Sequence, residues 1–206
     1  MICIVDYKIG NARSIQNMVN RSGYEAIISN SHAVIKSADK LILPGVGHFT
    51  RSMELLKEFD LINQLNDEVI GQKKPILGIC LGMQMMTRHS EEGNCEGLGW
   101  IEASTLKFKS EVNMNIKIPH MGWNRVEFLK PCQIAMDMPD PSRFYFVHSY
   151  YVSCDNDADV LSTTHHGQKF VSAFKRDNII GVQFHPEKSH RFGLTLISNF
   201  CNSDES

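Results

Sequence analysis

The sequence predicts an α/β fold in which a layered, mostly parallel sheet is flanked by helices. Short apolar runs alternate with segments of helical spacing through the first half of the chain. Turns rich in glycine or proline follow directly after two of these runs. The second half instead has aromatic and β-branched segments with period-two alternation, which add antiparallel strands to the sheet.

The first half reads as repeated strand–helix units. The apolar run 2–5 predicts a strand, and the spacing of Ile15, Met18 and Val19 predicts a helix that stops near Gly23. Helical spacing also covers residues 48–70, and further strands are expected in the runs 24–29, 40–45 and 75–80. Because parallel crossovers are right-handed, the functional site is expected at the carboxyl ends of these strands, where residues 44–49 and 78–82 fall.

The second half predicts antiparallel or mixed strands. Residues 105–128 alternate polar and apolar positions in several places, and residues 143–153 are aromatic and β-branched. Two strands joined by a polar turn at Lys175–Asn178 are expected within 169–187. Residues 191–201 predict a closing amphipathic helix.

Length, charge and cysteine usage narrow the class of protein. Residues 1–206 fit a single domain. A net charge of −2, without a basic patch, predicts binding to neither nucleic acid nor an anionic membrane. The six cysteines are scattered without a CxxC pair, and we find no leader or spanning segment, so we expect a cytoplasmic protein. No metal or cofactor site is predicted.

Cys80 is the first candidate for chemistry. It stands between Gly78 and Gly82 in "GICLG", directly after an apolar run and before a helical segment, the arrangement of a nucleophile elbow with cysteine in place of serine. Side chains at positions 78 and 82 would collide with neighbouring backbone in such a turn. A helix N-terminus there would favour the thiolate and offer N–H groups to an oxyanion. The alternative is a packed core cysteine, since free cysteines are among the most buried residues. The methionines that follow in "GMQMM" are expected to pack.

A cysteine nucleophile needs a base and a group that orients this base. "VQFHPEKS" supplies both, because in an extended segment His185 and Glu187 point to the same side while Pro186 stiffens the link. In "LPGVGHF" a strand ends in a turn that can present N–H groups from Val46 or Gly47, although a simple loop would look the same.

Together these elements resemble the class I, triad-type glutamine amidotransferases, which share a flavodoxin-like layered fold. The motifs "VDYKIGN", "LPGVGHF", "GICLGMQ", "SEEG", "GLGW", "PHMGWN", "FVHSYY" and "HPEKS" occur in order over essentially the whole chain. This set is most similar to the family of glutaminase subunits of imidazole glycerol phosphate synthase.

The resemblance implies roles for individual residues in hydrolysing glutamine. Cys80 would be the nucleophile, His185 the general acid and base, and Glu187 the orienting carboxylate. The Leu81 N–H and an N–H of the Val46–Gly47 turn would hold the oxyanion, and in this family that turn is thought to reorient when the partner's substrate binds. The resemblance assigns glutamine binding to Gln84, Glu92 and the backbone of His148, Ser149 and Tyr150. From the residues alone, Glu92 could equally be a solvated loop charge.

The resemblance also implies a partner, a (β/α)8-barrel cyclase that receives the ammonia. Trp123 would be an aromatic anchor of this interface, although from the sequence alone it could equally be a half-buried aromatic residue of the core. The further interface candidates are Ile9, Gly10, Asn11, Pro119, His120, Met121, Asn124 and Lys188. One departure is Lys8, which stands where the family usually has glycine in D-Y-G.

Other functions remain open at this stage. A paralogous glutaminase could supply ammonia to a related barrel enzyme that amidates a sugar for surface polysaccharide. A non-catalytic binding subunit would be marked by a degenerate triad, whereas all three members are present here. A cysteine peptidase of the same fold shares the elbow but gives no reason for "PHMGWN" and "HPEKS" together.

Overall fold

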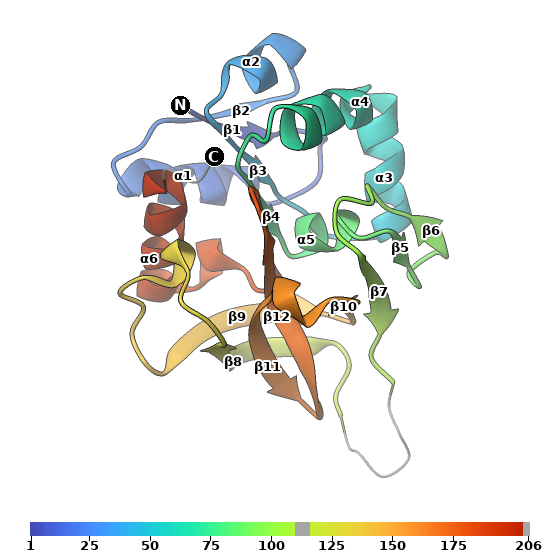
Figure 1. Cartoon of the computed structure of the whole chain (residues 1–206), viewed down its shortest axis with the longest axis vertical. Coiled ribbons are helices and arrows are strands. Elements are labelled where there is room, and N and C mark those ends of the chain that lie inside the picture. Colours follow the sequence, from blue (N-terminus) through green and yellow to red (C-terminus); the bar gives the residue numbers. More distant parts are fainter. Residues whose placement is uncertain (110–115, 204–206) are drawn as a thin grey trace.

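The computed structural model describes residues 1–109 and 116–203, and its centre is the parallel part of one large sheet (Figure 1). The strands run in the order β2-β1-β3-β4-β13, and every neighbouring pair in this part is parallel. These five strands are β1 (Ile2–Val5), β2 (Ala26–Ser29), β3 (Lys40–Leu43), β4 (Ile76–Ile79) and β13 (Ile179–Val182). The predicted strand–helix units of the first half are therefore confirmed.

Helices cover both faces of this parallel part. Figure 1 shows α1 and α6 on one side and α3, α4 and α5 on the other. The predicted helical stretch 48–70 is divided at Asp60, whose φ of +54° interrupts the helix. The helices and the π-helical turn η1 are α1 (Ala12–Arg21), α2 (His32–Ser37), α3 (Phe49–Glu58), α4 (Leu61–Asn66), η1 (Asp67–Gly71), α5 (Leu81–Met85) and α6 (His190–Asn202).

The second half extends the sheet with antiparallel strands, as predicted. Next to β13 lie β12 (Gln168–Arg176), β10 (Tyr150–Cys154) and β7 (Ala103–Lys107), and these neighbours are antiparallel. Beyond β7 come two short strands that the sequence did not predict, β5 (His89–Ser90), which is parallel to β7, and β6 (Cys95–Glu96). A branch from β12 contains β11 (Val160–His166), β8 (His120–Phe128) and β9 (Ser142–His148). Short 3₁₀ turns are η2 (Gln133–Ala135), η3 (Asp157–Asp159) and η4 (Pro186–Lys188). Residues 110–115 of the predicted stretch 105–128, and residues 204–206, lie outside the described residues.

The hairpin between β12 and β13 is tighter than the predicted turn at Lys175–Asn178. Lys175 and Arg176 continue β12 and pair with β13, so the turn is reduced to Asp177 and Asn178. The Asp177 φ of +50° suits a tight turn, and the Asn178 Nδ2 donates to Val69 O and Lys74 O, each at 2.9 Å. These bonds anchor the turn and allow the charged residues before it to stay in the strand.

The sheet places the predicted motifs at one edge. Residues 44–49 follow β3, Cys80 follows β4 and His185 follows β13, and these three strands are direct neighbours. The carboxyl ends of parallel strands share an edge, so the three motifs converge there. Within the described part of the chain, no helix is both long enough and apolar enough to cross a membrane.

Candidate active site

Cys80 occupies the sharp turn between β4 and α5. Its backbone has φ +54° and ψ −109°, a conformation that non-glycine residues rarely adopt, and its N–H donates to Val182 O at 2.8 Å. The residue is 5% exposed. The cysteine is thus held in a strained position at a helix start, as expected of a nucleophile elbow rather than of an ordinary packed cysteine.

Glycines make this turn possible by close backbone approach. A Cβ added at Gly82 would lie 1.9 Å from Leu43 O, and one added at Gly78 would lie 2.9 Å from the carbonyl of Gly82. A Cβ at Gly45 would lie 2.5 Å from Gly82 N. The prediction that side chains at 78 and 82 would collide with backbone is confirmed, and the start of α5 packs directly against the end of β3.

His185 and Glu187 form a buried pair. The distance from His185 Nδ1 to Glu187 Oε1 is 2.8 Å, and each side chain is 1% exposed. The link is not the extended segment that the sequence suggested, because a 3₁₀ turn begins at Pro186. The turn is fixed by Ser189, whose Oγ donates to His185 O at 2.6 Å and accepts from Tyr145 N at 3.0 Å.

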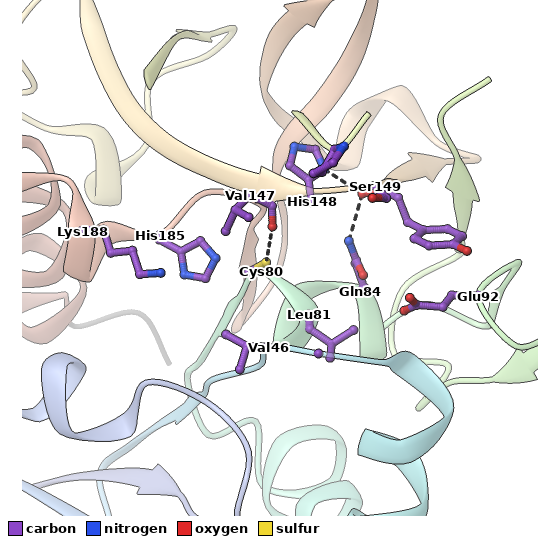
Figure 2. Close-up of a pocket in the computed structure, with 13 residues that line it drawn as sticks. Val46, Cys80, Leu81, Gln84, Glu92, Val147, His148, Ser149, His185 and Lys188 are labelled. Atoms are coloured by element: carbon purple, nitrogen blue, oxygen red, sulfur yellow. Dashed lines mark hydrogen bonds between the residues drawn. The ribbon is translucent and has the colours of Figure 1, made fainter. Parts of the chain in front are cut away.

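The surroundings of His185 favour its protonated form. Burial alone would lower its pKa, but the facing Cys80 and the Glu187 carboxylate outweigh this effect and raise the pKa to about 10. Figure 2 shows the imidazole beside Cys80, and Nε2 is buried without a hydrogen-bond partner among the described residues. The arrangement therefore favours an imidazolium beside the nucleophile candidate Cys80.

A pocket of about 500 Å³ opens at this pair (Figure 2). It brings together three groups of predicted residues: the oxyanion candidates, the glutamine-binding candidates and two of the interface candidates. Around Cys80 and His185, its lining includes Val46, Gly47, Leu81, Gln84, Glu92, Pro119, His148, Ser149, Tyr150 and Lys188. Glu187 does not line the pocket. It lies behind His185, whose imidazole forms part of the pocket wall.

Gln84 and Glu92 are both fixed by neighbouring groups. Gln84 Nε2 donates to Tyr150 O at 3.0 Å and to Gln183 Oε1 at 2.9 Å, which uses both of its amide hydrogens and leaves Oε1 as the atom for a ligand. One oxygen of Glu92 accepts from Phe49 N at 2.9 Å, at the first residue of α3. Glu92 is therefore an anchored carboxylate at the pocket rather than a free loop charge.

His148 and His120 form a hydrogen-bonded pair beneath the pocket. His148 Nδ1–H donates to Tyr150 O at 2.7 Å, so its Nε2 accepts from His120 Nδ1–H at 2.9 Å, and Asn124 Nδ2 donates to His120 Nε2 at 3.1 Å. Burial is the main reason why the pKa falls to about 3 for His148 and about 4 for His120. Both imidazoles are thus neutral donors and acceptors.

Strand β8 separates the interface candidates into two faces. Met121 and Trp123 point outward and are 62% and 40% exposed, while His120 is 4% exposed and points inward. The period of two along the strand explains this separation. The side chain of His120 is thus not available to a partner, contrary to our expectation, and the Asn124 amide also turns inward to His120 Nε2 and His165 O.

Trp123 is part of an exposed aromatic group rather than of the core. Its ring stacks on His190 at 5.5 Å between centroids and meets Tyr145 edge-on at 6.4 Å. Lys188 Nζ lies 5.7 Å from the centroid of the Tyr145 ring, and Lys188 also lines the pocket. The surface beside the pocket mouth thus combines exposed aromatic rings with a cation.

The loop after β1 packs against the turn after β3. It holds Ile9, Gly10 and Asn11, all half-buried, and a Cβ added at Gly10 would lie 2.9 Å from the Pro44 ring. Lys8, in the usual glycine position, adopts φ +68° and is fixed by Asp6, which accepts from the Lys8 N–H at 3.0 Å and from its Nζ at 2.9 Å. Lys8 therefore keeps a backbone conformation that glycine favours.

The remaining cysteines and the methionines of the motif have packing roles. All six cysteines are free, and burial raises the thiol pKa to about 11 for Cys3 and about 12 for Cys154 and Cys201. The methionines that follow Cys80 are completely buried, as predicted: Met83, Met85 and Met86.

Sequence reasoning missed Gln183. It is completely buried, and its side-chain amide contacts both Cys80 and Gln84. A signal was present, because Gln183 precedes His185 by two residues in "VQFHPE", the same spacing that was used to associate His185 with Glu187.

Comparison with known proteins defines the class. The sequence model of class-I glutamine amidotransferases matches residues 3–203, so the chain belongs to this family. Among solved structures, PurLQS from Thermotoga maritima has a TM-score of 0.72 at 15% identity, covering 98% of this chain and 97% of that one. The glutaminase domain of CTPS from Trypanosoma brucei has a TM-score of 0.66 at 16% identity, covering 100% and 95%. These likenesses show a shared fold.

Curated relatives share a much higher sequence identity with this chain than the solved structures do. The imidazole glycerol phosphate synthase subunit HisH 2 of Methanococcus maripaludis is 52% identical over 200 residues, which are 97% of this chain and 98% of the relative. The subunit HisH 2 of Pseudomonas aeruginosa is 46% identical with the same coverage. HisH 1 of Campylobacter jejuni (strain RM1221) is 47% identical over 201 residues, 97% of this chain and 98% of the relative. The resemblance inferred from the motifs is confirmed.

Proposed function

We propose that the chain hydrolyses glutamine to glutamate and ammonia as the glutaminase subunit of an imidazole glycerol phosphate synthase. The observation that carries this proposal is the geometry of Cys80 on its strained elbow, facing His185, which Glu187 holds at 2.8 Å. The curated relatives support the same assignment through the names they bear.

The geometry supports a thioester mechanism. The Cys80 thiolate attacks the side-chain amide carbon of glutamine, and Leu81 N–H with an N–H of the Val46–Gly47 turn stabilises the oxyanion. His185 gives its proton to the departing nitrogen, so that ammonia leaves and a glutamyl thioester remains. His185 then takes a proton from water, which attacks the thioester and releases glutamate, and the thiolate is regenerated. Glu187 keeps the imidazole oriented through Nδ1.

The rest of the pocket suits the two charged ends of glutamine. Glu92 would accept from the α-amino group, and its anchoring by Phe49 N supports this role. Gln84 would offer its Oε1, since both of its N–H groups are used within the protein. The backbone of His148, Ser149 and Tyr150 would receive the α-carboxylate, and all three residues line the pocket.

The ammonia would pass to a (β/α)8-barrel cyclase bound as a heterodimer partner, for histidine biosynthesis. The exposed Met121 and Trp123, with Lys188 at the pocket mouth, support a docking face at this position. None of the relatives described above is named as a sugar-amidating enzyme, so the comparisons do not favour the alternative acceptor. The six free thiols are consistent with activity in the cytoplasm.

Glutamate release tests the proposal. We expect slow hydrolysis of glutamine by the isolated chain and faster hydrolysis when the barrel cyclase is present with its own substrate. Cys80→Ala should abolish turnover in both conditions while leaving the fold intact by circular dichroism. Cys95→Ala is the matched control, since Cys95 lies outside the pocket, and it should keep wild-type rates. Unchanged turnover in Cys80→Ala would disprove the assignment.

A further inference from the structure

We infer that Gln183 is a positioning residue that holds the Cys80 sulfur in its thiolate form and links it to Gln84. The inference deepens the proposed function and rests on it. Gln183 directly follows β13, two residues before His185, and its side chain is completely buried. Its backbone N–H donates to Ser172 O at 2.9 Å, which fixes the residue between β12 and the elbow.

The neighbours of Gln183 determine the orientation of its amide. Tyr150 O can only accept a hydrogen bond, so the Gln84 amide must turn its nitrogen toward it, at 3.0 Å. The second N–H of Gln84 then donates to Gln183 Oε1 at 2.9 Å. With its oxygen used in this way, Gln183 must direct Nε2 to Cys80 Sγ, at 3.6 Å.

This contact favours one protonation state of the sulfur. An amide N–H stabilises a thiolate, which only accepts hydrogen bonds, more than a thiol. The Val147 carbonyl oxygen lies 4.0 Å from Sγ and can accept a hydrogen bond only from the thiol form (Figure 2). In a site with little access to water, the Gln183 donor therefore complements His185 in keeping the sulfur charged before glutamine arrives.

The same amide couples the nucleophile to substrate binding. Gln84 lies one helical turn beyond Cys80 and lines the pocket, and its nitrogen is fixed by Gln183 and the Tyr150 carbonyl. Loss of the Gln183 side chain would free both the sulfur and the Gln84 amide. The expected defect is therefore in the chemical step as well as in affinity for glutamine.

Alkylation of Cys80 by iodoacetamide across pH tests the inference in the full chain, with the modified residue located by mass spectrometry. Gln183→Met keeps the length of the side chain but removes the donor, and Gln183→Glu keeps an acceptor for Gln84 while placing a carboxylate beside the sulfur. We expect the pH midpoint of alkylation to rise by about one unit in the first variant and further in the second. Gln72→Glu, at an exposed position, is the matched control and should keep the wild-type midpoint.

Midpoints equal to that of the wild type in both Gln183 variants would overturn the inference, because a purely structural role moves the amount of folded protein but not the titration of the sulfur. Glutamine turnover separates this failure from failure of the proposed function. If Cys80→Ala is inactive and the Gln183 variants titrate normally, only the role of Gln183 is lost. If Cys80→Ala still hydrolyses glutamine, the proposed function is lost.

Discussion

At position 82 even a methyl group has no space. The added Cβ would lie 1.9 Å from Leu43 O and 3.3 Å from the Pro44 carbonyl carbon, and both contacts are with backbone that cannot rotate away. The elbow at Cys80 therefore requires glycine at position 82, because a larger residue would push the start of α5 away from the end of β3.

Gly82→Ala should therefore abolish the nucleophile geometry. We expect the free energy of unfolding to fall by about 3 kcal/mol, typical of severe overpacking, and glutaminase activity to be lost. Urea unfolding and glutamate release measure the two effects. Gly71→Ala is the matched control, since nothing lies within 4 Å of a Cβ added at Gly71, and it should keep both stability and activity. Wild-type activity in Gly82→Ala would show that the elbow tolerates a shift of the strands.

Single residues also show what the sequence could and could not predict about the site. Cys80, His185 and Glu187 come from local motifs with known spacing, and the structure brings them together. The inward direction of His120 was not predictable in the same way, because residues on both sides of it belong to one motif and only the alternation along β8 separates them. Gln183 has the same two-residue spacing from His185 that Glu187 has, but its contacts with Cys80 and Gln84 join segments about 100 residues apart, which the spacing alone does not show.

At the scale of elements, the pairing of β8 with β9 places His120 opposite His148. Phe146 and Phe170 pack against both imidazoles, and His166 stacks on His120 at 4.2 Å between ring centroids. An apolar environment of this kind disfavours the charged imidazolium. The packing of β8 against β9 is therefore most stable when both histidines are neutral.

This pairing predicts a loss of stability in acid. The unfolded histidines titrate near 6.5, whereas the folded pKa is about 4 for His120 and about 3 for His148, so the unfolded chain binds more protons between these values. The contribution of the two neutral histidines to the free energy of unfolding is complete above pH 6.5. It is lost as the pH falls toward 4, at about 1.4 kcal/mol per pH unit for each histidine. Urea unfolding of His120→Gln against the wild type should show a difference that shrinks from pH 7 to pH 5.

A control separates this effect from general acid sensitivity. His32 is exposed on α2, and His32→Gln should give an unfolding free energy that parallels the wild type over the same pH range. A constant difference between His120→Gln and the wild type at all pH values would contradict the prediction, since it would mean that His120 binds the same protons folded and unfolded.

The elements themselves were predictable to different degrees. Runs such as 2–5 and 75–80 are short, apolar and bounded by turn residues, so the parallel strands follow from local pattern. The branch of β8, β9 and β11 depends on pairing between segments far apart in the chain, which alternation alone cannot assign. The break at Asp60 was hidden because apolar residues continue at helical spacing on both sides of it.

At the scale of the whole molecule, the pocket and the exposed face of β8 lie side by side. Pro119 and Lys188 line the pocket, and Trp123 stacks on His190, the first residue of α6. A partner seated on this face would cover the pocket mouth. The site would then deliver its product to the partner with less loss to solvent, which fits a subunit that passes on ammonia.

Trp123→Ala should weaken the complex with the barrel cyclase. Loss of a central aromatic anchor predicts a rise in Kd of about tenfold or more, measured by isothermal titration calorimetry. Leu129→Ala is the matched control, because Leu129 is 48% exposed but follows the end of β8 that is remote from Pro119, and its Kd should stay at the wild-type value. If the wild type, Trp123→Ala and Leu129→Ala all have the same Kd, the partner does not bind at Trp123.

Leu43 and Gly45 lie so close to Gly82, at the start of α5, that no Cβ fits between them. The elbow that carries Cys80 and the start of the turn, at Pro44 and Gly45, are therefore packed closely against each other. The far part of the turn is not packed in this way, since nothing lies within 4 Å of a Cβ added at Gly47 and Val46 is 38% exposed. If the turn reorients when the enzyme is activated, the movement would be a rotation of the Val46–Gly47 peptide that leaves the Cys80 elbow in place.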